Sequence, residues 1–177
     1  INHLEKSKNY NIDHQRELIK TKIEYGFGVV MEQADRLFDE DYETALKMYQ
    51  KANQLFSDAK NSGLLVLNQK HPKFEAWIRK DTKINFDKED IADLYWLAAA
   101  YGGSISSSRG NPYELIHLPT VGRLLRTCIA IDSSWNNGAA YSAMMSFTSS
   151  RSDLSEKMLR DSCLLYTSPS PRDLSTS

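Results

Sequence analysis

The histidine and cysteine side chains, which most often bind metals or act as nucleophiles, are not arranged for either role in this sequence. The four histidines have no partner at i, i+4 and no cysteine or glutamate at a metal-ligand spacing; they are His3, His14, His71 and His117. A metal site needs several such ligands close together, so we predict none. Cys128 lies in the apolar helical pattern LLRTCIAI, which favours a small buried side chain over a reactive thiol.

The acidic and glycine-rich segments also lack a catalytic arrangement. One group of carboxylates falls at a junction between two predicted helices, where a solvated turn explains it; the group is Asp35, Asp39, Glu40, Asp41 and Glu43. The segment YGFG at residues 25–28 has no third glycine and no preceding strand, so it is not a dinucleotide-binding loop. The segment SSSRGNP at residues 106–112 offers hydroxyls without a base at a recognisable spacing. We therefore predict that the protein is not an enzyme and needs no cofactor.

The composition is that of one ordinary globular domain. The chain has 177 residues, 41% of them hydrophobic, and a formal net charge of −1, which gives no electrostatic case for nucleic-acid binding. Its longest apolar run is far below the roughly 18 residues of a membrane-spanning helix. Residue 1 is Ile, so we expect a fragment. Eight of the last 15 residues are Ser, Thr or Pro, and we expect residues 1–162 to form the domain and residues 163–177 a non-native disordered tail.

The spacing of apolar residues predicts helices along the whole domain. We expect helices over residues 12–38, 42–67, 74–78, 87–106, 119–131 and 139–147, with short turns between them, and a last helix that Ser152 or Ser155 begins and that ends near Ser162. Asp87 and Asn111 are predicted N-caps. No segment alternates with a period of two for long enough to be a strand, so the predicted fold class is all-α.

Two of these segments resemble tetratricopeptide (TPR) repeats, in which small residues allow antiparallel helices to pack closely. In EDYETALKMYQKANQLF, the small residues are Ala45 and Ala52, with Tyr42 and Tyr49 expected to fill the space beside them. The segment CIAIDSSWNNGAAYSAM resembles a junction between two repeats. Ala52 and Ala130 lie 78 residues apart, which is no multiple of the usual period of about 34. We therefore expect degenerate TPR-like repeats that form antiparallel helix pairs, an α-solenoid-like bundle with an inserted pair.

The helix over residues 94–101 is the most unusual part of the sequence. Its eight residues, LYWLAAAY, are apolar or aromatic on every face, and two glycines follow. Such a helix is enclosed on all sides. It is either a central core helix, with the glycines allowing close crossing, or a helix with one face, carrying Trp96, on an apolar ligand channel. The sequence leaves both alternatives open.

Three blocks between residues 25 and 150 together resemble the T component associated with tripartite ATP-independent periplasmic (TRAP) transporters. The most specific block joins LYWLAAAYGGS to the turns at Asn111-Pro112 and Leu118-Pro119. The resemblance implies an all-helical TPR-like lipoprotein, anchored on the periplasmic side, that forms a homotrimer. It also implies a solute-binding protein as partner and an apolar channel through each protomer.

From these observations we expect a non-catalytic accessory component of a TRAP-type uptake system. The expected partner is an extracytoplasmic solute-binding protein, and a hydrophobic small molecule is the expected ligand. The candidate ligand-binding residues are Tyr95, Trp96, Ala99 and Tyr101. The alternative is a generic TPR scaffold for protein–protein interaction, which a polar and charged concave surface would favour.

Overall fold

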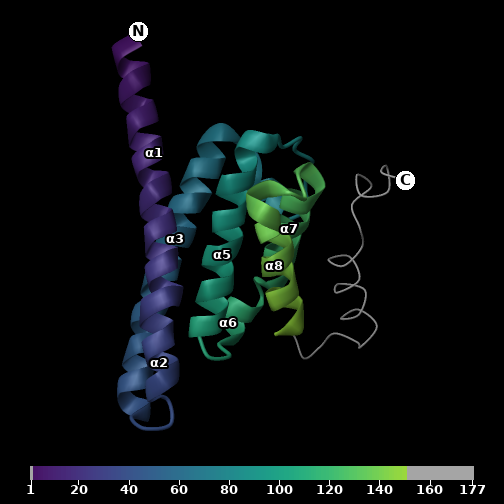
Figure 1. Cartoon of the computed structure of the whole chain (residues 1–177). Coiled ribbons are helices and arrows are strands. Elements are labelled where there is room, and N and C mark those ends of the chain that lie inside the picture. The colour runs from purple at the N-terminus through teal and green to yellow at the C-terminus, as the bar shows by residue number, and fades with distance from the viewer. Residues whose placement is uncertain (1, 151–177) are drawn as a thin grey trace, which may run out of the picture.

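The computed structural model describes the backbone of residues 2–150 and the side chains of residues 12–150. Over this range the chain is helical without a strand (Figure 1), which confirms the all-α class. The elements are α1 (Asn2–Tyr25), a π-helix (Gly26–Met31), α2 (Glu32–Leu37), α3 (Tyr42–Lys70), α4 (Phe74–Ile78), a 3-10 turn (Lys88–Asp90), α5 (Ile91–Ser107), α6 (Pro112–Leu115), α7 (Leu118–Ile131) and α8 (Trp135–Ser149). No helix in this part of the chain is long and apolar enough to span a membrane.

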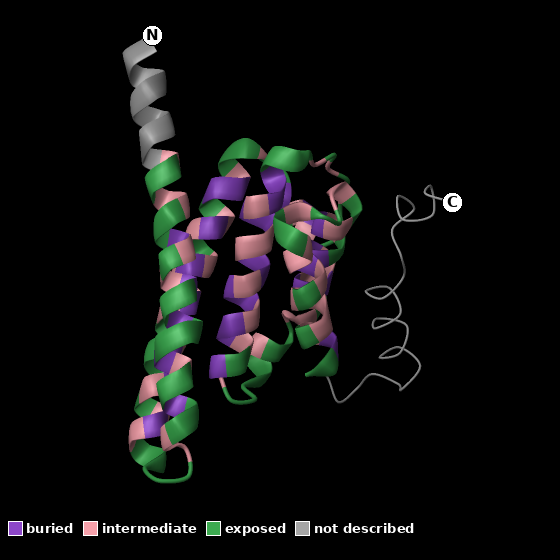
Figure 2. Ribbon diagram, in the orientation of Figure 1, coloured by how far each residue is buried: buried purple, intermediate pink, exposed green. Residues whose placement is uncertain are grey.

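Helix α5 is the centre of the fold. It stands between the long α1–α3 pair and the α7–α8 pair (Figure 1), and it contacts all four of these helices. Its buried residues lie on several faces (Figure 2), including Leu94, Leu97, Ala98, Ala100 and Tyr101. The protein therefore encloses most of this apolar helix, as the sequence predicts.

Side-chain caps determine where the helices begin. The Asp41 carboxylate accepts a hydrogen bond from the Thr44 backbone N–H at 3.1 Å. The Asn111 side chain accepts one from the Tyr113 N–H at 3.0 Å, with Pro112 at the first helical position. Each cap satisfies an N–H that has no partner within its own helix. Both positions are breaks that the sequence predicts.

The predicted turn before α8 is also present. Asn136, Asn137 and Gly138 have positive φ angles of 46°, 56° and 77°, so the regular helix begins only after them. This agrees with the expected helix over residues 139–147. The last predicted helix and the tail of residues 163–177 lie outside the described residues, and the division at residue 162 stays a prediction.

The first helical region of the structure differs from the predicted helix over residues 12–38 in two ways. The observed helix begins at Asn2 rather than at residue 12, and a π-helix separates α1 from α2. A π-helical turn holds an extra residue and changes the direction of the side chains that follow. The interruption coincides with a close contact to α3, because a Cβ on Gly26 would lie 2.7 Å from the Phe56 ring.

Phe56 joins three elements at one point. Its side chain is completely buried, and a Cβ on Gly103 of α5 would lie 2.4 Å from its ring. The ring of Phe27 in the π-helix lies 4.6 Å from that of Phe56. The absence of side chains at Gly26 and Gly103 thus lets α3 hold the π-helix and α5 together. This confirms that a glycine after the 94–101 segment allows a close helix crossing.

The packing predicted for the segment EDYETALKMYQKANQLF is confirmed in part. Ala45, Ala52 and Tyr49 are buried where α3 packs against its partner helices. The prediction for Tyr42 is wrong, because this side chain is 56% exposed. Its ring meets that of Phe38 edge to face, with 5.3 Å between the centroids. The TPR-like repeat itself stays a prediction.

Candidate ligand-binding cleft

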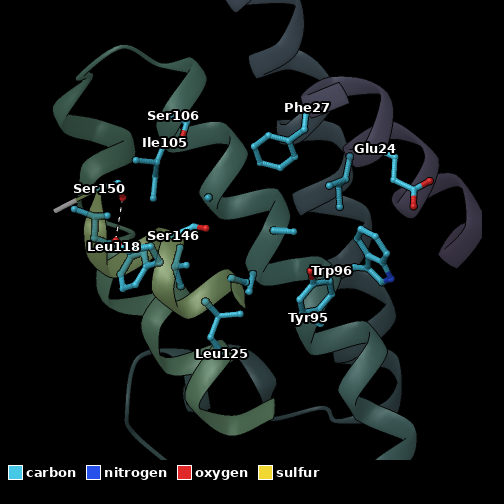
Figure 3. A pocket seen from close by; sticks show the side chains of 17 residues that line it. Glu24, Phe27, Tyr95, Trp96, Ile105, Ser106, Leu118, Leu125, Ser146 and Ser150 are labelled. Carbon is cyan, nitrogen blue, oxygen red and sulfur yellow. Dashed lines mark hydrogen bonds between the residues drawn. The ribbon is translucent and has the colours of Figure 1, made fainter. Parts of the chain in front are cut away.

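An apolar cleft lies beside the central helix, between the end of α1, the π-helix, α5, α7 and α8 (Figure 3). Its volume is about 540 Å³, within the range of pockets that hold small organic ligands. Helix α5 forms its floor, α7 contributes Leu118, Val121 and Leu125, and α8 contributes Phe147. One face of the apolar helix α5 thus borders open space, and its other faces pack against neighbouring helices.

Three of the four predicted ligand-binding residues line this cleft. Tyr95, Trp96 and Ala99 lie along it, and the rings of Tyr95 and Trp96 meet edge to face with 5.3 Å between centroids. Tyr95 also contacts Trp135 of α8, with 5.2 Å between the two ring centroids. Their role in ligand binding stays a proposal.

Tyr101 does not line the cleft. Its side chain is only 5% exposed, and its ring lies 5.4 Å from Lys60 Nζ and 5.2 Å from the His117 ring. Burial, together with the nearby carboxylate of Glu114, raises the pKa of the Tyr101 hydroxyl above its ordinary value. Tyr101 therefore belongs to the packing between α3, α5 and the start of α7.

Gly102 explains why the cleft stays open. A Cβ at this position would meet no atom within 4 Å, whereas one on the neighbouring Gly103 would overlap Phe56. The two adjacent glycines thus have opposite surroundings. One allows close packing and the other leaves space, and only the structure distinguishes them.

Sequence reasoning missed the walls of the cleft. Ile23 and Phe27 form one wall, and Phe27 is 39% exposed. Both residues belong to the apolar stripe of the first predicted helix, and a stripe predicts burial without saying against what. The sequence does not show that a large aromatic residue such as Phe27 is exposed at the edge of a cleft, because this depends on how the helices are arranged in the folded protein.

The structure also shows the surroundings of the residues that could bind a metal or act as a nucleophile. No group of three or more His, Cys, Asp or Glu side chains between residues 12 and 150 is placed to hold a metal ion. Cys128 is completely buried, and burial raises the pKa of its thiol to about 12, so it stays protonated and unreactive. The predicted small buried side chain is confirmed for Cys128.

These features define an all-α protein with an apolar cleft beside its central helix. The sequence model of the TRAP transporter T-component (TAtT) family matches residues 4–155, and the chain belongs to this family. No curated protein matches the chain. The family is a component of a transport system rather than a known family of enzymes, which supports an accessory role in TRAP transport.

Proposed function

We propose that this protein is a non-catalytic accessory component of a TRAP-type uptake system that binds an apolar small molecule in its cleft. The observation that carries the proposal is the cleft itself. Its floor is a helix that is apolar on every face, and its walls carry aromatic and aliphatic side chains. A protein that only held its helices together would fill a space of this size with side chains.

Tyr95, Trp96 and Ala99 are the residues that we propose contact the ligand. Tyr95 and Trp96 present large aromatic surfaces, and Ala99 with Gly102 leaves room above them. Aromatic rings give much apolar contact area at a small cost in side-chain entropy. The cleft thus combines aromatic surface for apolar contacts with space for a ligand.

The partner that we propose is the extracytoplasmic solute-binding protein of the same transport system. Membership of the TRAP T-component family supports it. We further propose that the protein acts on the periplasmic side, held there by a lipid anchor, and that it assembles as a homotrimer. Membership of the family supports the role in transport directly. The periplasmic location, the lipid anchor and the homotrimer are our inferences from that membership.

Sedimentation velocity tests the partner and the trimer together. We expect the protein alone to sediment with the mass of three protomers. Mixed with the solute-binding protein of the same transport system, it should form a heavier species that contains both chains. The proposal fails for the partner if the two proteins sediment independently at concentrations of tens of micromolar, and for the trimer if the protein alone stays monomeric.

A further inference from the structure

The polar groups of the cleft define the charge of the ligand that it accepts. Among the described residues, the only charged side chain of the lining is Glu24, and no Lys or Arg lines the cleft. We infer that the ligand is an apolar molecule with a hydrogen-bond-donating head, preferably an ammonium group, and not a carboxylate. This inference deepens the proposed function and rests on it.

Glu24 is available to a ligand. Its side chain is exposed, and within residues 12–150 it forms no ion pair. Figure 3 shows it at the same end of the cleft as Trp96 and Phe27. Its carboxylate points outward at this end of the cleft (Figure 3). From this position it attracts an organic cation by its charge, and the negative faces of the aromatic rings that line the cleft add to the attraction.

The serine hydroxyls at the opposite end of the cleft also favour a ligand whose head group donates hydrogen bonds. Ser146 Oγ donates to the Ser142 carbonyl at 3.2 Å, and Ser150 Oγ donates to the Phe147 carbonyl at 2.9 Å. Each hydroxyl has one hydrogen, so what these two residues offer a ligand is an acceptor. The hydroxyls of Tyr95 and Ser106 can donate or accept, so they do not discriminate between heads.

The helix ends add to the same preference. Helices α5 and α8 end at Ser107 and Ser149, beside the lining residues Ser106 and Ser150. The carbonyl end of a helix carries partial negative charge and disfavours an anion.

The start of α7 at Leu118 also meets the cleft, but it offers few N–H groups to an anion. Pro119 has no N–H. The N–H groups of Thr120 and Val121 both bond to the His117 carbonyl, at 2.9 and 3.2 Å.

Three probes with the same ten-carbon chain test the inference: decylammonium, decanol and decanoate. Their binding is measured by isothermal titration calorimetry at pH 7, below the concentrations at which they form micelles. We expect decylammonium to bind most tightly and decanoate about 10-fold more weakly or worse, with decanol between them. Equal affinities for the three probes, or tighter binding of decanoate, would overturn the inference while leaving apolar binding intact. Failure of all three to bind would count against the proposed function itself.

Glu24→Gln separates the charge of the carboxylate from its shape. This variant should bind decylammonium about 3- to 5-fold more weakly, the effect of one exposed ion pair, and decanol unchanged. Glu40→Gln is the matched control, because Glu40 is exposed in the α2–α3 turn and its loss changes the net charge equally. If Glu24→Gln and Glu40→Gln weaken the binding of decylammonium equally, the net charge of the protein explains the preference for an ammonium head and Glu24 does not.

Discussion

Replacing Phe56 with alanine is expected to lower the free energy of unfolding by about 3–5 kcal/mol, the range measured for large aromatic residues in well-packed cores. The ring is completely buried and fills the space that Gly26 and Gly103 leave between three elements. Because Gly26 and Gly103 have no side chains of their own, little can move in to fill the cavity. Urea unfolding followed by circular dichroism measures the loss.

Phe27→Ala is the matched comparison for Phe56→Ala. Phe27 contacts the same ring but is 39% exposed, so its loss should cost markedly less. In the Phe56→Ala background, Gly103→Ala should recover part of the stability, since its Cβ would lie 2.4 Å from the place of the ring. If the Phe56 and Phe27 variants lose equal stability, the account of Phe56 as the junction of the three elements is wrong.

The second large effect is expected at Asp90, which is completely buried at the start of α5. Its carboxylate accepts hydrogen bonds from Lys70 Nζ at 2.8 Å and from the Asp87 N–H at 2.9 Å, and it lies 2.9 Å from His71 Nε2. Burial alone would raise the pKa of Asp90, but the hydrogen bonds from Lys70, the Asp87 N–H and His71 outweigh it and lower the pKa. Asp90→Asn should cost about 2–3 kcal/mol at pH 7, less than for a fully buried ion pair because Lys70 still reaches water.

The pH dependence distinguishes a lost charge from a lost contact. A carboxylate whose pKa is lowered by folding stabilises the protein above its unfolded pKa of about 3.9, and the contribution disappears as the pH falls through the folded value. The unfolding free energies of the original protein and Asp90→Asn should therefore begin to converge below about pH 4 and approach each other further as the pH falls through the lowered pKa of folded Asp90. Asp81→Asn, in an exposed turn, should change little at any pH. A constant difference between the original protein and Asp90→Asn from pH 7 down to pH 3 would show that the charge of Asp90 is unimportant.

The sequence predicts most of the helices because their ends carry local signals. Asp41, Asn111 and Asp87 act on N–H groups within three residues of themselves, so a reader of the sequence can place them. The π-helix at Gly26–Met31 has no such signal, since it coincides with a contact to Phe56, thirty residues further along the chain.

The cleft could be predicted only in part for the same reason. An all-apolar helix shows that every face is covered by something apolar, and it does not distinguish side chains from empty space. Tyr95, Trp96 and Ala99 border the cleft and Tyr101 does not, because α3 and the start of α7 cover the Tyr101 face. Gly102 and Gly103 are identical in sequence terms and opposite in surroundings.

Filling the cleft tests the central claim most directly. Gly102→Leu places a side chain in open space and should keep or slightly raise stability, because leucine favours a helix by about 0.5–1 kcal/mol over glycine. Gly28→Leu is the control, since Gly28 is also open but lies outside the cleft.

The measurement is a fluorescence titration with N-phenyl-1-naphthylamine, a neutral apolar probe. The account predicts saturable binding to the original protein and to Gly28→Leu, and a loss of about 10-fold or more in Gly102→Leu, the worth of one displaced apolar group. Equal binding to all three folded proteins, or no binding to any of them, would contradict it.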